Sequence, residues 1–385
     1  MRAAIVTREW PPEVYGGAGV HVTELVKSLR TLVDVDVYCM GAERSDAVAF
    51  ELGSSSGINP ALEVVRTDVA MAAAVAAAGA DVVHSHTWYA NLAGQLAAQT
   101  LGMAHIVTAH SLEPRRPWKA EQLGGGYRVS SWIEAEAYRA ADAVIAVSAG
   151  MRDDILDCYP FIDPAKVAVV HNGIDVETFT PTQDQAVLTS YGIDPQRPFV
   201  LFVGRITRQK GLIHLLRAAA SLPRDVQLVL AASSPDEKHI GDEVAAAVAG
   251  LKHSRPDDVV WIEKQVSKPE LIALLSQAAV FACPSIYEPL GIVNLEAMAC
   301  GTAVVASAVG GIPEVVVHGV TGILVDYNPN EIAEFEANFA AGLIEALDNP
   351  TRSHDMGVAG RQRAMDHFGW DAIAQRTVDI YRSVS

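Results

Sequence analysis

Short apolar runs alternate with longer amphipathic stretches along almost the whole chain. The runs lack the polar alternation of a half-exposed sheet, so each predicts a parallel strand that is covered on both faces. One series of runs is followed by a second, which predicts an α/β protein with two doubly wound, Rossmann-like sheets. The first series comprises 3–7, 33–38, 82–85, 105–109, 143–148 and 167–170, and the second comprises 199–203, 226–231, 259–262, 280–284, 303–307 and 322–325.

Residues 171–198, between the two series, contain several Gly and Pro and no sustained apolar period, which predicts a linker. We therefore expect an amino-terminal domain over 1–170 and a carboxyl-terminal domain over 171–370, with the last helix, 371–385, packing back on the first domain. Doubly wound sheets bind ligands at the carboxyl ends of their strands. The two domains are thus expected to face each other across a cleft that holds the functional site.

Composition excludes several classes of protein. Half of the 385 residues are hydrophobic, which is enough for two cores, and the net charge of −17 argues against nucleic acid or an anionic membrane as partner. The most apolar stretch, 69–80, is mostly Ala and shorter than the about 20 residues of a membrane span. No export signal follows Met1, and the four scattered Cys suggest neither a disulfide framework nor structural zinc, so we expect a cytoplasmic protein.

A glycine-rich loop, Tyr15-Gly16-Gly17-Ala18-Gly19, follows the first predicted strand and precedes a helical pattern over 21–29. Glycines at a helix start let backbone amides approach a phosphate closely, although a simple turn has the same composition. Dinucleotide binding is a further alternative, with Gly17, Gly19 and the acidic Asp36. Against it, the glycines do not directly follow the strand, and the third glycine of that fingerprint is missing.

Two cations, Arg205 and Lys210, lie just beyond the first strand of the second series, in Gly-Arg-Ile-Thr-Arg-Gln-Lys-Gly. Cations at that position can neutralise a departing diphosphate, as a bound metal does in other enzymes. The alternative is a solvated charged loop.

Two glutamates flank a glycine in Glu-Pro-Leu-Gly-Ile-Val-Asn-Leu-Glu, where Glu288 follows a strand and Glu296 belongs to the next helix. Their separation is about two helical turns if the helix is continuous, so both can reach one ligand from the same side. Carboxylates accept hydrogen bonds from sugar and ribose hydroxyls. Ordinary surface charge is the alternative.

Two patterns raise the question of a metal. Asp34 and Asp36 lie inside the second predicted strand rather than in a free loop. His84 and His86 share a strand face, but no third ligand of matching spacing accompanies them, so a structural or cleft-lining role is favoured. We expect no metal and no cofactor apart from the substrates.

These motifs, together with His171-Asn172-Gly173-Ile174-Asp175 and Gly310-Gly311-Ile312-Pro313-Glu314, resemble the retaining GT-B glycosyltransferases of family four over nearly the whole chain. More narrowly, 13–22, 84–89 and 108–114 look like the group of actinobacterial glycogen synthases and maltose-1-phosphate synthases.

The resemblance implies a role for each matching residue. Glu288 would contact hydroxyls of the donor sugar and Glu296 the ribose, while Arg205 and Lys210 would hold the diphosphate. His110, at a strand end, would lie beside the transferred sugar. Backbone groups around the phosphates would come from Gly16, Gly17, Leu290, Gly291, Ile292 and Val293.

The implied activity is transfer of α-glucosyl from ADP-glucose, or UDP-glucose, to a 4-hydroxyl of glucose 1-phosphate or of an α-1,4-glucan in glycogen synthesis. Larger bacterial glycogen synthases carry Lys where this chain has Val14 and Asp where it has Thr87, which argues against long-glucan synthesis. An NAD-dependent oxidoreductase and a non-catalytic glycan-binding protein are the alternatives. A protein that only binds glycans would not need Arg205 and Lys210 to stabilise a leaving diphosphate.

A basic cluster stands out in the acidic chain and consists of Arg115, Arg116, Lys119 and Arg128. Solvated charge is the usual explanation of such a run. The sharper hypothesis is that these cations bind the phosphate of glucose 1-phosphate while Trp118 or Trp88 contacts a sugar face. The sequence does not determine the oligomeric state, and a homodimer is compatible with it.

Overall fold

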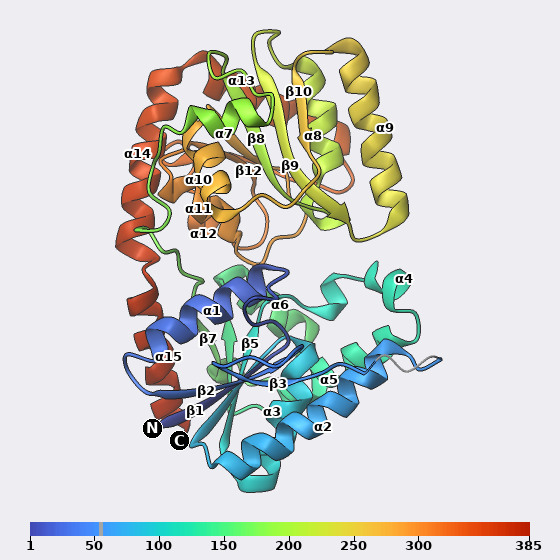
Figure 1. Ribbon diagram of the computed structural model, residues 1–385, viewed down its shortest axis with the longest axis vertical. Coiled ribbons are helices and arrows are strands. Elements are labelled where there is room, and N and C mark those ends of the chain that lie inside the picture. The colour runs from blue at the N-terminus through green and yellow to red at the C-terminus, as the bar shows by residue number, and fades with distance from the viewer. Residues whose placement is uncertain (54–56) are drawn as a thin grey trace. The chain divides into compact units, whose positions relative to one another are not determined.

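The computed structural model describes residues 1–53 and 57–385, which form two compact units. The first unit comprises Met1–Gly173 and Trp370–Ser385, and the second comprises Ile174–Gly369 (Figure 1). Each unit holds one parallel sheet with helices on its faces, so the predicted α/β class with two Rossmann-like sheets is confirmed.

The sheet of the first unit is entirely parallel, in the order β3-β2-β1-β4-β5-β6-β7. The order reverses direction between β1 and β4, so the loops after these two strands open at a topological switch point. The strands are β1 (Arg2–Thr7), β2 (Asp34–Met40), β3 (Val48–Phe50), β4 (Val82–His86), β5 (Ala104–Ala109), β6 (Ala143–Ala146) and β7 (Val167–Val169). The helices are α1 (Gly17–Leu29), α2 (Pro60–Ala78), α3 (Trp88–Leu101), η1 (Glu113–Arg115), α4 (Lys119–Leu123), α5 (Gly126–Ala140), α6 (Ala149–Cys158), η2 (Pro164–Lys166) and α15 (Trp370–Val384).

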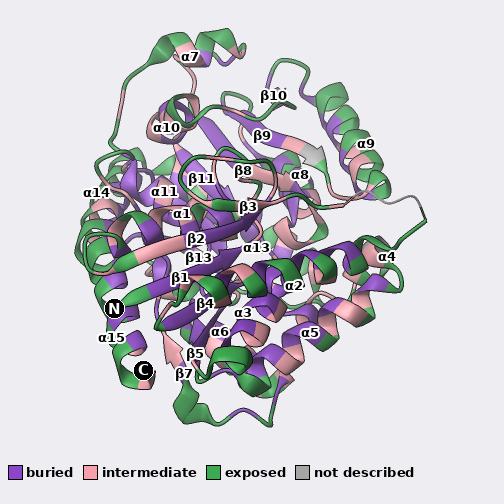
Figure 2. Ribbon diagram, turned by 60° about the horizontal axis from the view of Figure 1, so that its bottom comes forward, coloured by how far each residue is buried: buried purple, intermediate pink, exposed green. Residues whose placement is uncertain are grey.

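Alternate residues of β1 explain why both faces of this sheet are covered. Ala3 and Ile5 pack in a core with residues of α1 and α15, whereas Ala4 and Val6 pack in a second core with residues of α2 and α3. β1 and β4 are accordingly almost wholly buried (Figure 2). The last helix, α15, lies beside α1, and the two chain ends lie close together in this unit (Figure 1).

The sheet of the second unit is also parallel, in the order β10-β9-β8-β11-β12-β13, and its switch point lies between β8 and β11. Its strands are β8 (Phe199–Ile206), β9 (Gln227–Pro235), β10 (Val259–Ile262), β11 (Val280–Cys283), β12 (Val304–Ser307) and β13 (Gly322–Val325). Its helices are α7 (Gln185–Ser190), η3 (Arg208–Lys210), α8 (Leu212–Ala218), η4 (Ala219–Ser221), α9 (Lys238–Ser254), α10 (Lys268–Gln277), α11 (Ile292–Ala299), α12 (Ile312–Val315), α13 (Ile332–Asp348) and α14 (Pro350–His367).

Within the described residues, no helix combines the length and the apolar character that crossing a membrane requires.

Candidate active site

The predicted cations of the second unit lie at its switch point, and each is paired with a carboxylate. Lys210, at the end of η3, places its Nζ 2.6 Å from Oε2 of Glu288, which lies in the loop after β11. Arg205, in β8, donates from Nη1 to both carboxylate oxygens of Asp236, at 2.6 and 2.9 Å. The sequence identified three of these four residues, and the structure adds Asp236, which follows β9.

The Lys210–Glu288 pair is largely shielded from water, since the side chains are only 22% and 8% exposed. Burial alone would lower the pKa of the Lys210 ammonium, but the Glu288 carboxylate outweighs that effect and the pKa is raised. Lys210 therefore stays charged at neutral pH, which suits a group that binds a diphosphate.

Close backbone packing holds the loop of Glu288 against its neighbours. The amide of Gly311 donates to the carbonyl oxygen of Glu288 at 3.0 Å, and a Cβ at Gly310 would lie 2.0 Å from that same oxygen. Gly310 also has φ +53, a conformation that other residues rarely adopt. Ser285 Oγ donates to Glu288 Oε2 at 3.2 Å. The carboxylate is therefore fixed from several sides.

Glu296 projects from α11, the helix that begins at Ile292. Glu288 precedes this helix, so the two acids do not share one continuous helix. Their separation in the sequence therefore does not place them on the same side of a helix. Burial raises the pKa of the Glu296 carboxyl to about 7, although Lys268 and Lys210 oppose the shift. Lys210 is thus the ion-pair partner of Glu288 and also opposes the rise of the Glu296 pKa.

The start of α11 also carries a polar group that sequence analysis did not single out. Asn294 is fully buried, and neither its Oδ1 nor its Nδ2 has a hydrogen-bond partner among the described residues. The Nδ2 would lie 2.7 Å from a Cβ at Gly291, so the amide sits directly against the helix start. Because an unpaired buried amide costs about 1–3 kcal/mol, a site beside Glu288 is where a ligand could satisfy it.

The glycine-rich loop of the first unit already binds an anion, namely a side chain of the protein itself. Gly16 is the N-cap of α1 and Gly17 its first residue. The amides of Tyr15 and Gly16 donate to Oε2 of Glu9, at 2.7 and 2.8 Å. The loop therefore has the geometry to bind an oxyanion, and Glu9 would compete with a phosphate for it.

Four histidines cluster around the carboxyl ends of β4 and β5. His86 Nδ1 and His110 Nε2 share a hydrogen bond at 3.0 Å, and His21, from α1, packs edge-on against His110 with ring centroids 4.7 Å apart. The His84 ring lies against that of His86, tilted by 37° with centroids 4.2 Å apart. Its two ring nitrogens share hydrogen bonds with the hydroxyls of Tyr381 and Thr108, at 2.7 and 2.6 Å. The sequence spacing identified His84 and His86 as a pair on one strand, but it did not identify His21. In the sequence, His21 looks like any other position on the buried face of a helix.

All four imidazoles are neutral at physiological pH. Burial lowers the pKa of His84, His86 and His110 well below the usual range, and neighbouring histidines add to the effect. Burial lowers the pKa of His21 to about 4. His110 can therefore exchange hydrogen bonds with hydroxyl groups but cannot act as an acid at pH 7.

Backbone geometry is unusual next to this cluster. Thr87 has φ 64, and it is the non-glycine residue with positive φ in the described part of the chain. A β-branched residue in that region costs about 1–3 kcal/mol, and such positions concentrate at functional sites.

The basic cluster is partly neutralised by acids of the same unit. Arg115 pairs with Asp154 and Asp157, at 2.8 and 2.7 Å, and Arg116 pairs with the buried Glu113 at 2.6 Å. The suggested sugar contact of Trp88 is wrong, because this side chain is 2% exposed and stacks on Tyr89.

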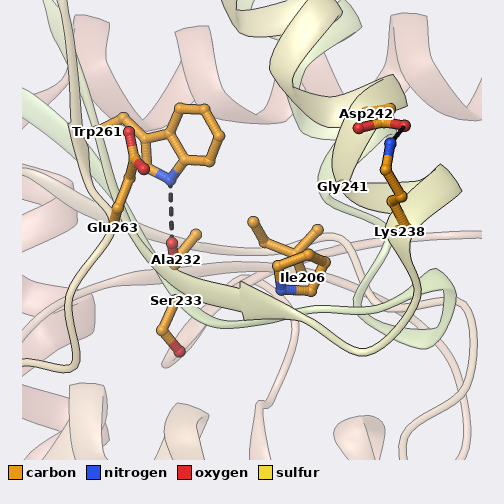
Figure 3. A pocket seen from close by; sticks show the side chains of 9 residues that line it. Ile206, Ala232, Ser233, Lys238, Gly241, Asp242, Trp261 and Glu263 are labelled. Atoms are coloured by element: carbon orange, nitrogen blue, oxygen red, sulfur yellow. Dashed lines mark hydrogen bonds and ion pairs between the residues drawn. The ribbon is translucent and has the colours of Figure 1, made fainter.

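A pocket of about 260 Å³ opens at the carboxyl ends of β8 and β9, where Ile206, Ala232 and Ser233 line it (Figure 3). Trp261 forms one wall and donates from Nε1 to the carbonyl of Ala232 at 3.0 Å, while Lys238 is paired with Asp242. None of the predicted site residues lines this pocket.

Two doubly wound units with paired cations and acids at a switch point define the GT-B class of glycosyltransferases. The family model "Glycosyltransferase Family 4" matches residues 15–178, and the model "Glycosyl transferases group 1" matches residues 185–363. The chain belongs to the family-four glycosyltransferases, as its motifs predicted.

Individual proteins similar to this chain include two curated relatives and one solved structure. Over its whole length, the chain is 56% identical to the α-maltose-1-phosphate synthase of Mycolicibacterium smegmatis, and all of that protein is covered. It is 54% identical to the α-maltose-1-phosphate synthase of Mycobacterium tuberculosis, again over both full chains. Among solved structures, sucrose-phosphate synthase of Thermosynechococcus elongatus superposes with a TM-score of 0.82 at 26% identity, covering 99% of this chain and 98% of that one.

Proposed function

We propose that the protein transfers a glucosyl unit from ADP-glucose to the 4-hydroxyl of glucose 1-phosphate, with retention of configuration, and so makes maltose 1-phosphate. The full-length identity with α-maltose-1-phosphate synthases supports this glucosyltransferase activity and its acceptor. The observation that carries the chemistry is the Lys210–Glu288 ion pair beside Arg205 at the switch point of the second unit.

The donor diphosphate would take over cations that the protein holds in place with its own acids. Arg205 exchanges Asp236 for phosphate oxygens, and Lys210 exchanges part of its contact with Glu288. The released carboxylate of Glu288 then accepts hydrogen bonds from hydroxyls of the donor sugar, and Glu296 does the same for the ribose. Because the cations are already charged and positioned, they stabilise the leaving group without reorganisation.

The bond from glucose C1 to the diphosphate oxygen breaks while the acceptor 4-oxygen forms its bond on the same face. The acceptor proton passes to the departing phosphate oxygen, so no basic side chain is needed. For His110 we propose a hydrogen bond from its neutral imidazole to a hydroxyl of the transferred sugar. The amides of Leu290, Gly291, Ile292 and Val293, and the loop of Gly16 and Gly17, would contact the phosphates.

For the acceptor phosphate we propose the basic cluster as binding site, with Arg116 and Lys119 as the cations to test. Arg116→Ala and Lys119→Ala should each raise KM for glucose 1-phosphate more than KM for the donor. Arg139→Ala, on an exposed part of α5, is the control. An unchanged KM for glucose 1-phosphate in both variants refutes the cluster as acceptor site.

One assay tests the whole proposal. The protein is incubated with ADP-glucose or UDP-glucose and with glucose 1-phosphate or glycogen, and nucleotide release and product size are followed. Formation of a phosphorylated disaccharide with ADP-glucose is expected. Growth of a polymer, turnover only with UDP-glucose, or binding of NAD instead of a sugar nucleotide would each replace the proposal with one of its alternatives.

We also propose that the enzyme works in the cytoplasm, where its four free cysteines would remain reduced. We further propose that the protein forms a homodimer, which light scattering of the purified protein would test.

A further inference from the structure

Three histidines of the first unit meet at one point, although they come from three separate elements. His21 belongs to α1, His86 ends β4, and His110 follows β5. One nitrogen from each ring lies within 4.8 Å of the corresponding nitrogens of the other two. The switch point between β1 and β4 explains this convergence, because it brings the element after β1 over the ends of β4 and β5.

The nitrogens of this cluster are poorly satisfied by the protein itself. His21 is 2% exposed and His86 fully buried, yet both ring nitrogens of His21 and Nε2 of His86 have no hydrogen-bond partner in the described chain. His84, directly adjacent, differs in that both of its nitrogens are bonded to hydroxyls. Buried polar atoms are normally paired, so the unpaired nitrogens of His21, in a ring that meets two other imidazoles at one point, indicate a ligand that supplies a missing bond.

We propose that His21, His86 and His110 form a binding site for a late first-row divalent ion, of which Zn²⁺ is the best fit. Imidazole nitrogen is a preferred ligand of Zn²⁺ and Co²⁺ and a poor one for Mg²⁺ or Ca²⁺. Three histidines with an open fourth position are a known ligand set for zinc. His110 is partly exposed, which leaves that position accessible to water.

The distances fit after a small movement of the rings. Zinc–nitrogen bonds of about 2.0–2.1 Å place tetrahedral ligand atoms roughly 3.4 Å apart. His86 Nδ1 and His110 Nε2 are already closer than that, at 3.0 Å. The three ligand nitrogens all lie within 4.8 Å of one another, so no pair has to close by more than about 1.4 Å. An ion bonded to those two nitrogens would replace their mutual hydrogen bond.

A supporting group is present behind His21. Asn172 is buried, and its Oδ1 has no partner among the described residues. It lies near enough to the His21 ring to oppose the lowering of that pKa, without reaching hydrogen-bond geometry. Metal-bound histidines usually donate their second N–H to such an acceptor, and a small rotation of His21 would form that bond.

Occupation of the site would inhibit the transferase, because an ion bound to His110 would hold its ring away from the hydrogen bond that we propose to the transferred sugar. This consequence rests on the proposed function of His110, whereas metal binding itself does not. The two are therefore measured separately.

The test uses the full-length protein and Co²⁺ as a spectroscopic probe, since four-coordinate Co²⁺ absorbs visible light far more strongly than the hydrated ion. Titration should give one equivalent with intense visible bands, and Zn²⁺ should displace it. His21→Gln and His110→Gln should each weaken Co²⁺ binding by more than about tenfold, and Asn172→Ala by about tenfold. His354→Gln, at an exposed position of α14, is the control for surface histidines.

Weak bands typical of six-coordinate Co²⁺, or full-strength binding by both His21→Gln and His110→Gln, would overturn the site. Thermal unfolding identifies a variant that fails to fold. If His21→Gln fails to fold, the Co²⁺ affinity of His110→Gln decides whether the site exists, because His110 is partly exposed. If Co²⁺ binds as expected but Zn²⁺ leaves turnover unchanged, the metal site stands and the proposed role of His110 is wrong.

Discussion

Replacing Lys210 by Met should destabilise the second unit although it removes no apolar contact. The ammonium and the Glu288 carboxylate are 22% and 8% exposed and lie 2.6 Å apart. Removing one partner of a buried pair leaves a charge without compensation, which costs about 3–5 kcal/mol. Because Lys210 retains some contact with water, we expect the lower end of that range, about 3 kcal/mol.

The double variant Lys210→Met/Glu288→Gln separates this effect from a loss of packing. With both charges gone, the free energy of unfolding should return to the wild-type value or exceed it, since replacing a whole buried pair is often neutral or stabilising. Lys238→Met is the matched control, because its pair with Asp242 is 87% and 65% exposed and should contribute nothing measurable.

Urea unfolding combined with hydrogen exchange of β8 and β11 amides reports the second unit separately from the first. Turnover should fall by orders of magnitude in the single and double variants alike, since both lack one of the two cations that we propose to bind the diphosphate. The reasoning would be refuted if Lys210→Met were as stable as the wild type, or if the double variant were as unstable as Lys210→Met.

Three further predictions concern two buried polar side chains and one close backbone contact. Asn294→Leu should raise the free energy of unfolding by about 1–3 kcal/mol, because it removes an unpaired buried amide, and should weaken donor binding in a calorimetric titration. Burial and the nearby Glu113 raise the pKa of Glu134 from 4.5 to about 8. The folded state thus holds a proton that the unfolded state has lost, so stability falls as pH rises from about 4.5 to 8, and Glu134→Gln should flatten this fall in urea midpoints. Gly310→Ala should lower turnover far more than Gly319→Ala, since both have positive φ but only a Cβ at Gly310 meets the backbone of Glu288; equal effects would contradict this.

Local patterns predicted the sheets well because a buried parallel strand is a continuous apolar run. Every predicted run corresponds to a strand, and the strand that was missed, β3, is only three residues long at the edge of its sheet. An edge strand that is partly exposed has no strong apolar signal, so periodicity cannot separate Val48–Phe50 from a loop.

The site was predictable as far as it depends on strand ends. Arg205 lies near the end of β8 and Lys210 just after it, while Glu288 follows β11, the neighbouring strand. Parallel strands bring their carboxyl ends to one edge of the sheet. Asp236 and His21 were missed for a different reason. An Asp after a strand and a His on a buried helix face have many structural explanations, and only the strand order shows that they meet Arg205 and His110.

The two units therefore solve opposite electrostatic problems. In the second, opposite charges are held in contact, so an anionic substrate can be bound by exchange of one carboxylate for another anion, without any change in protonation. In the first, burial lowers the pKa of His110 well below its usual range, so the hydrogen bond that we propose from this imidazole to a sugar hydroxyl should not change with pH in the physiological range. A neutral imidazole cannot protonate a leaving group at this pH. In the proposed mechanism, the leaving group receives the acceptor proton instead, and Arg205 and Lys210 would stabilise its charge. We therefore expect that Arg205 and Lys210 alone supply the positive charge used in catalysis. The pH–rate profile should then show no histidine titration between pH 6 and 7.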